Sequence, residues 1–277
     1  MQLHVGCAMW THPAWRDHQP TPSRRLHSYA TWCNAVEGNT TFYATPARKS
    51  VEQWAEQTAP DFRFVLKLPK TVTHERRLHG AERELRTFLD AVEPLGPRLH
   101  ALWVQLPGSF GPSDLGTLAR FLRTLPGRCA VEVRHPAFFT DERAAQQLER
   151  ALATVDAEWI PFDTAILFDG PATSPAEYEA RSKKPNLPRR TAALTEFPIV
   201  RYHGRDDDDR TVAGWRPWVD VTAEWLREGR SPTVFIHTPD NASSLPLARA
   251  FHEEVRTRVP ELPELPEPEQ TDPMTLF

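Results

Sequence analysis

The sequence predicts a single α/β domain that folds as a (β/α)8 barrel of the TIM type with parallel strands, and three observations predict it. Short β-like runs alternate with helical segments along most of the 277 residues. Eight such runs begin roughly 27 to 40 residues apart, the length of one strand plus one crossover helix. No G-x-G-x-x-G follows the first run and no G-x-x-x-x-G-K-[ST] occurs, so a doubly wound nucleotide-binding sheet is the less favoured alternative.

The eight expected strands are short runs in which apolar residues mostly come first and polar residues stand at the carboxyl end. Runs of this length, each followed by a helical segment, are typical of a parallel sheet. The strands are expected at Leu3–Cys7, Ala35–Asn39, Phe62–Leu68, Ala101–Gln105, Cys129–Arg134, Trp159–Asp163, Pro198–His203 and Thr233–His237.

The segments between the strands mostly carry apolar residues at helical spacing, as Leu85, Phe88 and Val92 do. The stretch from Gly170 to Glu196 is the exception, because it is long, polar and rich in proline, with at most a short helix around Ala176–Ser182. We expect an irregular segment there, before the seventh strand. Helices are expected at Ser23–Cys33, Ala47–Gln57, Ala81–Val92, from Ser113 through Leu122, from Thr140 to about Val155, at Pro217–Arg227 and at Ala242–Val259.

The chain divides into a barrel domain of residues 1–259 and a tail of residues 260–277. From Pro260 the sequence Pro-Glu-Leu-Pro-Glu-Leu-Pro-Glu-Pro-Glu is acidic and rich in proline. Such a segment repels itself and stays extended, so we expect a flexible tail that leaves the fold.

Composition places the chain in an ordinary class. The net charge of −4 gives no general attraction to nucleic acid or to anionic lipid. The three cysteines are far apart and odd in number, so neither a disulfide framework nor a zinc site is expected. Neither a signal peptide nor a stretch long and apolar enough to span a membrane is present, so we expect a cytoplasmic protein without membrane contact.

Charged and polar side chains stand at the carboxyl ends of the expected strands. Residues two apart on a strand share a face, so Glu132 points with Arg134, and Arg201 points with His203. A barrel brings these strand ends into one mouth, where the fold carries its catalytic groups. We therefore expect one cluster that combines Glu37, Lys67, Glu132, Arg134, Arg201 and His203.

The roles within this cluster stay open. Glu37 and Glu132 would form an acid/base pair, or would bind a divalent metal together with His135 or His203. Lys67, Arg134 and Arg201 would hold a phosphate or a carboxylate, since arginine offers such groups a two-pronged fork. His203 and His237 are candidates for moving a proton.

Three other features each have a functional and a structural interpretation. The run Asp206–Asp209 would bind a divalent cation, although four consecutive acids more often form a solvated loop. Cys7 would be a nucleophile, although a buried inert thiol is the more common case. Four aromatic residues after the first two strands would either stack on a sugar or base, or cap the core: Trp10, Trp15, Phe42 and Tyr43.

Six segments at the ends of the expected strands form a distinctive series. They are Gly6-Cys-Ala-Met-Trp10, Val36-Glu-Gly-Asn-Thr-Thr-Phe-Tyr43, Phe64-Val-Leu-Lys67 with Thr73-His74, Val131-Glu-Val-Arg-His135, Val200-Arg-Tyr-His-Gly204 and Asp240-Asn241. Taken together and in this order, they resemble the DUF72 (YecE-like) family. The resemblance covers about residues 3 to 259 and implies a TIM barrel. It also implies a pocket that His74 joins, and Asn241 is expected to bind substrate beside it. It supplies no reaction.

From these residues we expect an enzyme that acts on a small anionic, phosphate-bearing substrate by hydrolysis or acid/base chemistry, with Glu37, Glu132 and His203 as catalytic groups. A nucleic-acid substrate is a variant of this prediction. The alternative from a different class is a non-catalytic module that binds a ligand or a partner with the same mouth.

The end of the chain, Met274-Thr-Leu-Phe277, resembles the Leu-x-Leu-Phe part of bacterial peptides that bind the DNA sliding clamp. Two apolar anchors on a flexible tether suit docking into a shallow hydrophobic pocket. Clamp binding through Met274, Leu276 and Phe277 is therefore one hypothesis for the tail. A frayed terminus without a partner is the other.

Overall fold

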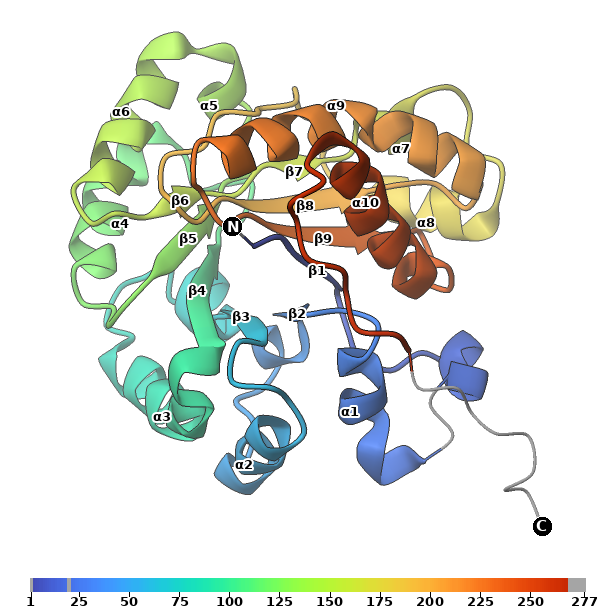
Figure 1. The fold of residues 1–277 in the computed structure, drawn as a ribbon. Coiled ribbons are helices and arrows are strands. Elements are labelled where there is room, and N and C mark those ends of the chain that lie inside the picture. Colours follow the sequence, from blue (N-terminus) through green and yellow to red (C-terminus); the bar gives the residue numbers. More distant parts are fainter. Residues whose placement is uncertain (1, 19–20, 269–277) are drawn as a thin grey trace.

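The computed structural model describes residues 2–18 and 21–268, which form a curled, nine-stranded parallel sheet covered on its outer face by helices (Figure 1). The strands follow one another in the order β6-β5-β4-β3-β2-β1-β9-β8-β7. Their bounds are β1 His4–Cys7, β2 Ala35–Gly38, β3 Arg63–Lys67, β4 Leu99–Gln105, β5 Cys129–Glu132, β6 Glu158–Trp159, β7 Phe162–Asp163, β8 Ile199–His203 and β9 Thr233–His237.

The prediction of a parallel α/β fold with a barrel-like sheet is confirmed, but the described strands number nine rather than eight. The expected sixth strand, Trp159–Asp163, is divided at Pro161, which has no N–H for a regular ladder. Its first half pairs with β5 and its second half pairs with β8. The N–H of Ile160 donates to Val131 at 2.9 Å, and the N–H of Arg201 donates to the carbonyl of Pro161 at 3.0 Å. The two ends of the strand order therefore lie next to each other in the chain.

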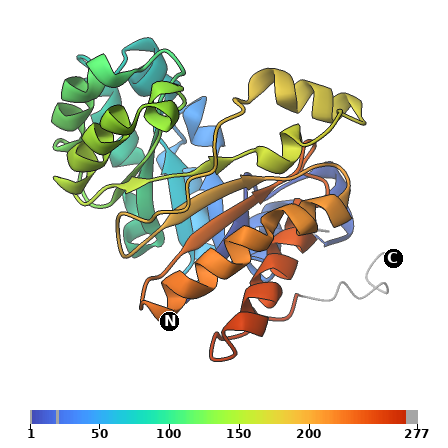
Figure 2. The same cartoon turned by 90° about the horizontal axis from the view of Figure 1, so that it is seen from above.

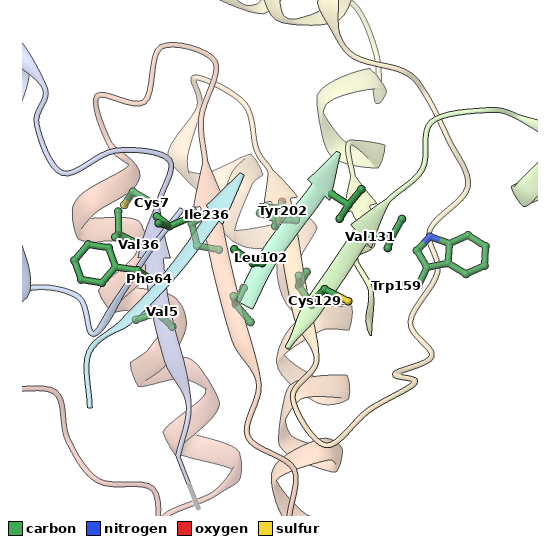
Figure 3. Close-up of a cluster of buried hydrophobic side chains, with 14 of the residues drawn as sticks. Val5, Cys7, Val36, Phe64, Leu102, Cys129, Val131, Trp159, Tyr202 and Ile236 are labelled. Atoms are coloured by element: carbon green, nitrogen blue, oxygen red, sulfur yellow. The ribbon is translucent and has the colours of Figure 1, made fainter. Parts of the chain in front are cut away.

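Strand residues alternate between an outer and an inner apolar layer. Val36 packs outward under the helices, whereas its neighbour Ala35 belongs to the inner layer. Figure 3 shows the outward-facing side chains of several strands, among them Val5, Phe64 and Ile236. The inner layer is small and comprises Ala35, Val65, Ala101, Trp103, Ala130, Ile160, Ile199 and Phe235. Because these residues fill the interior, the polar groups are left at the strand ends.

The longer helices follow the predicted segments with one substantial difference, and the one-turn helices Ala137–Thr140 and Ala165–Phe168 were not predicted. The last helix but one begins at Asp208, nine residues before the expected start at Pro217. Asp207 caps it by accepting from the N–H of Arg210 at 3.0 Å, and burial of Trp215 and Trp218 outweighs the cost of an internal proline. The bounds are α1 Arg25–Ala30, α2 Arg48–Glu56, α3 Glu82–Val92, α4 Leu115–Leu122, α5 Ala137–Thr140, α6 Glu142–Ala153, α7 Ala165–Phe168, α8 Pro175–Lys183, α9 Asp208–Arg227 and α10 Ser244–Arg258.

The segment from Gly170 to Glu196 contains one short helix, α8, as expected, and is otherwise irregular. Figure 2 shows it in yellow, projecting from the body of the molecule. The acidic run beside it, Asp206–Asp209, is exposed to solvent, as the structural interpretation predicts, but it leads into α9 rather than forming a separate loop. Asp207 caps α9 and Asp206 accepts a hydrogen bond from Ser174 of the irregular segment.

The start of the tail does not leave the fold. Leu262 and Leu265 are buried, and the side chains of Arg249 and Arg256 on α10 donate to carbonyls of this segment. The expectation of an unpacked tail is therefore wrong for these residues, because the two leucines bury apolar surface in the hydrophobic core. The boundary at residue 259 remains a prediction. The clamp-binding residues Met274, Leu276 and Phe277 lie outside the described residues.

Within residues 2–18 and 21–268, no helix has both the length and the apolar character needed to cross a lipid bilayer. The cytoplasmic location stays a prediction.

Candidate active site at the carboxyl ends of the strands

The expected charged side chains meet at the carboxyl end of the sheet, although they come from four separate strands. Glu37 lies in β2, Lys67 ends β3, Glu132 ends β5 and Arg201 lies in β8. Ion pairs connect all four, and Arg134, two residues after Glu132, joins them. We call these five side chains the charged cluster. Residues as far apart in the chain as Glu37 and Arg201 thus form one site.

Glu37 is the centre of the charged cluster. Its Oε1 lies 2.6 Å from Nζ of Lys67, and its Oε2 lies 3.2 Å from Nε of Arg201. The same Oε2 lies 2.8 Å from Nε2 of His237, at the end of β9. The carboxylate is fully buried, so three partners from three other strands replace its water.

Glu132 is the second buried carboxylate, and Arg201 connects it to the first. Oε1 of Glu132 lies 2.7 Å from Nε of Arg134, and its Oε2 lies 3.6 Å from Nη1 of Arg201. Arg201 therefore bridges the two glutamates. Its guanidinium also lies 4.6 Å from the ring centre of Phe162, and that of Arg134 lies 5.3 Å from the same ring.

Both glutamates are ionised at neutral pH. Burial alone raises the pKa of a carboxyl, but for Glu37 the charges of Arg201, Lys67 and His237 outweigh it and hold the pKa well below the usual 4.5. For Glu132, burial is likewise outweighed, mainly by Arg134 and Arg201, and the pKa is lowered. Neither carboxyl can donate a proton near neutral pH. Both carboxylates serve as counter-ions for the cations that contact them.

Lys67 is the group of the charged cluster closest to titrating near neutral pH. Burial, followed by the repulsion of Arg201, lowers its pKa from 10.5 to about 8 against the attraction of Glu37 and Glu132. Its ammonium also donates to Asn39 at 3.1 Å and lies 4.8 Å from the ring centre of Trp103. The aromatic face supplies part of the stabilisation that water would give.

Two neutral histidines stack at the end of β8 and β9. Burial lowers the pKa of His203 well below 6.5 and that of His237 to about 4. Nδ1 of His203 lies 3.2 Å from the carbonyl of Gly204, which can only accept, so Nδ1 carries the proton and Nε2 has the lone pair. Nε2 of His237 donates to Glu37, so the 3.3 Å contact of Arg201 with that nitrogen is not a hydrogen bond. The two rings are 5.7 Å apart.

His74 and Asn241 have different relations to the charged cluster. His74 lies in the π-helical turn Thr71–Glu75 after β3, half-buried, and burial together with the charge of Arg134 lowers its pKa. It therefore borders the charged cluster. Among residues 2–18 and 21–268, the hydrogen bonds of Asn241 are to its own loop, where its Oδ1 accepts from Ser244 at 3.3 Å and its N–H donates to Thr238 at 3.2 Å. Its backbone has a positive φ of 64°, which fits a turn residue.

The irregular segment contributes side chains that the sequence analysis did not select. Arg189 donates to the buried carboxylate of Asp163 at 2.6 Å, and Trp218 donates to the same oxygen at 2.6 Å. Lys184 follows the last residue of α8, and the carbonyl of Pro185 accepts from Thr164 at 2.8 Å. In the sequence, the pairs Lys183-Lys184 and Arg189-Arg190 within this proline-rich stretch could have indicated that it carries functional cations.

Of the other candidates, Cys7, Trp10 and Trp15 have structural roles, whereas Tyr43 is 68% exposed and does not cap the core. Burial raises the pKa of the Cys7 thiol, which makes it a poor nucleophile. Trp15 is buried and its Nε1 donates to the carbonyl of Ala242 at 2.7 Å, so it caps the core. Trp10 packs edge-on against Trp54. Across residues 2–18 and 21–268, no group of three or more His, Cys, Asp or Glu side chains is placed to hold a metal ion.

A cavity of about 430 Å³ lies at the opposite end of the sheet, beside the amino ends of β1, β2 and β3. Asn34, Phe62, His252 and the leucines of the packed tail segment line it, and the charged cluster does not reach it. The charged cluster and this cavity are therefore separate features of the molecule.

Comparison with known proteins gives a consistent result. Residues 4–272 match the family described as "Protein of unknown function DUF72". Two curated proteins called UPF0759 protein YecE, from Escherichia coli O157:H7 and Escherichia coli K12, are each 35% identical over 266 residues, covering 95% of this chain and 96% of theirs. A crystal structure of a DUF72 family protein from Enterococcus faecalis V583 has a TM-score of 0.66 and 18% identity, covering 98% of this chain and 100% of that one. At that identity the structural likeness concerns the fold alone.

Proposed function

The chain belongs to the DUF72 family, whose description leaves its activity open, and we propose that its charged cluster binds a small phosphate-bearing anion and acts on it by hydrolysis or acid/base chemistry. The proposal takes the fold to be an eight-stranded barrel in which β6 and β7 are halves of one strand, interrupted at Pro161. In such a barrel, the carboxyl ends of the strands are where catalytic groups gather.

The observation that carries the proposal is an excess of positive charge. Three cations, Lys67, Arg134 and Arg201, pair with two carboxylates, Glu37 and Glu132, so one positive charge lacks a counter-ion within the charged cluster. The adjoining histidines His74, His203 and His237 have lowered pKa values and add no charge at neutral pH. A partly buried cationic site without a matching carboxylate favours an anionic ligand.

Arg134 is the side chain best placed to contact such a ligand. Its side chain is 20% exposed, more than that of Arg201 or Lys67. Its Nε donates to Glu132, while neither Nη group has a hydrogen-bond partner among the described residues. A guanidinium with two unused donors matches two oxygens of a phosphate.

Glu37 and Glu132, which the sequence assigns as catalytic, are better explained as positioning residues. Both are ionised, fully buried and engaged by cations, so they fix Arg201 and Arg134 rather than transfer protons. The proton-transfer role then falls to His203, whose Nε2 is unprotonated, and to Lys67, whose pKa of about 8 lets it act as an acid. Asn241 stays a predicted substrate contact.

Binding is tested by isothermal titration calorimetry of the full chain with inorganic phosphate and with phenyl phosphate at pH 7.5. Arg134→Ala is expected to weaken binding about tenfold, because a charge-assisted hydrogen bond is lost. Arg143→Ala, an exposed arginine on α6, is the matched control and is expected to bind like the parent. Absence of binding by the parent chain, or equal affinities for the two variants, would overturn the proposal.

Catalysis is tested separately, by release of inorganic phosphate from a panel of phosphomonoesters. His203→Gln is expected to lower kcat about a hundredfold while the affinity for phosphate is kept. The exposed His79→Gln is the control and is expected to leave kcat unchanged. If phosphate binds but no ester is turned over, the chain is a ligand-binding module and the catalytic half of the proposal is wrong.

A further inference from the structure

The irregular segment between β7 and β8 brings one more cation, Lys184, to the charged cluster. Lys184 directly follows α8, and the carbonyl of the next residue, Pro185, accepts from the buried hydroxyl of Thr164 at 2.8 Å. Thr164 directly follows β7, two residues after Phe162. Phe162 pairs with Arg201 across the sheet, and its ring contacts the guanidinium groups of Arg201 and Arg134. The tether therefore attaches this segment next to the residue that both arginines contact, close enough for their charges to act on Lys184.

The position of this segment is held from both sides. After Lys184, the guanidinium of Arg189 pairs with Asp163 at 2.6 Å. Before it, the carboxylate of Glu177 on α8 receives two hydrogen bonds from Arg205, at 3.0 and 2.7 Å, and both side chains are buried. Lys184 is therefore fixed by contacts that precede and follow it.

The charges around Lys184 are mainly positive. Burial, together with the charges of Arg201, Arg134 and Lys183, lowers its pKa from 10.5 to about 8. Lys184 is also the charge that depresses the pKa of His203 most. Glu179, an acid that raises this pKa, pairs with Lys183 on the outer side of α8. Among the described residues, no carboxylate forms an ion pair with Lys184.

We propose that Lys184 contacts the bound anion and makes the site selective for a terminal phosphate, a dianion, over singly charged phosphodiesters and carboxylates. This inference rests on the proposed function. The charged cluster alone has one positive charge in excess, and Lys184 raises the excess to two. A phosphomonoester carries close to two negative charges at neutral pH, because its second pKa is about 6. A phosphodiester carries one.

The experiment compares two adjacent lysines that differ in their surroundings. Lys184→Met removes the inward charge and keeps the aliphatic stem, and Lys183→Met removes the exposed charge that pairs with Glu179. Lys184→Arg restores the charge. Each full-length variant is titrated at pH 7.5 with methyl phosphate and with dimethyl phosphate, and thermal unfolding checks that each one folds.

The expected result is a difference between the two probes. The parent chain binds methyl phosphate at least about tenfold more tightly than dimethyl phosphate, because loss of one charge-assisted contact has an effect of that size. Lys184→Met loses about tenfold in affinity for methyl phosphate only, Lys184→Arg recovers most of it, and Lys183→Met binds both probes like the parent.

Three results would overturn the inference, and one of them would also overturn the proposed function. If Lys184→Met and Lys183→Met bind alike while the parent binds methyl phosphate, Lys184 is not a ligand contact and the charged cluster still binds anions. If Lys184→Met weakens both probes equally, the selectivity is wrong. If the folded parent binds neither probe, the proposed function is wrong as well.

Discussion

Glu37 and Arg201 show how single residues determine the chemistry of the site. A carboxylate without water is costly in a protein interior unless several donors replace the solvent. Glu37 has three such donors, and Arg201 shares its guanidinium between Glu37 and Glu132. The charges are therefore interdependent, since removing one carboxylate leaves at least two buried cations with a missing partner.

Replacing Glu37 by Gln is expected to destabilise the protein by about 3–5 kcal/mol, because Lys67 and Arg201 then lose a buried counter-ion. The change is measured as the free energy of unfolding in urea at pH 7. Glu52→Gln is the control, since the ion pair of Glu52 with Arg48 on α2 is exposed. This substitution is expected to change the free energy of unfolding by less than about 0.5 kcal/mol. A loss for Glu37→Gln as small as that of the control would contradict the account of the charged cluster.

At the scale of elements, α8 is held in position by the buried ion pair of Glu177 with Arg205 rather than by a wide apolar face. Although burial raises the pKa of Glu177, hydrogen bonds from Arg205 and from the N–H groups of Thr173 and Asp206 lower it to about 2. Arg205 also donates to the carbonyls of Asp169 and Pro171 at the start of the segment. The pair thus connects the irregular segment to the end of β8.

Glu177→Gln is expected to release this segment, because Arg205 keeps a buried charge without its carboxylate. Trypsin then cuts within residues 181–190, which contain several lysines and arginines, at least about tenfold faster than in the parent. Glu179→Gln, two residues further on the exposed side of α8, is the matched control. Cleavage is followed by mass spectrometry. Equal cleavage rates for the two variants would show that the ion pair of Glu177 with Arg205 does not hold the irregular segment in place.

The packed start of the tail gives a second prediction at this scale. Leu262→Ala is expected to reduce the free energy of unfolding by about 2–4 kcal/mol, because it removes a buried side chain that packs with the core. The neighbouring Glu261 is exposed, so Glu261→Ala is expected to change stability little. A flexible, unpacked tail would show no difference between the two variants in urea unfolding.

For the whole molecule, buried neutral histidines set the response to acid. Burial lowers the pKa of His4 to about 3, of His100 to about 2, and of His237 and His252 to about 4. In the unfolded chain these groups take up protons near pH 6.5, whereas the folded protein does not until a much lower pH. The stability that these histidines contribute is therefore complete above pH 6.5 and is lost as the pH falls from 6.5 through their folded-state pKa values of about 4 to 2. Glu37 and Glu132 add a further loss below their ordinary pKa of 4.5.

Each buried histidine is expected to contribute about 1.4 kcal/mol per pH unit to this slope. The test is the free energy of unfolding in urea between pH 7 and pH 4.5, for the parent and for His100→Phe. His100 is buried and packs edge-on against Phe197, so phenylalanine keeps the aromatic contact and removes the titrating group. The slope is expected to become shallower by about that amount, and an unchanged slope would show that His100 does not resist protonation.

The sequence by itself determined the succession of strands and helices, because hydrophobic periodicity and segment length are local properties of a chain. It also determined that Glu37, Lys67, Glu132, Arg134 and Arg201 would meet, since parallel strands bring their carboxyl ends to one edge. His237 was recognised only as a candidate proton carrier. Its hydrogen bond to Glu37 required the pairing of β9 with β1, which local patterns do not reveal.

Tertiary structure alone decided how these groups work. The ionised state of Glu37 and Glu132 results from the cations that surround them. The division of β6 from β7 results from Pro161, which stands between a segment that pairs with β5 and a segment that pairs with β8. The approach of Lys184 to the arginines and the burial of Leu262 depend on contacts between segments distant in sequence. The charge balance and the burial of a side chain depend on all residues that surround it in space. A sequence contains these residues but does not show the distances between them.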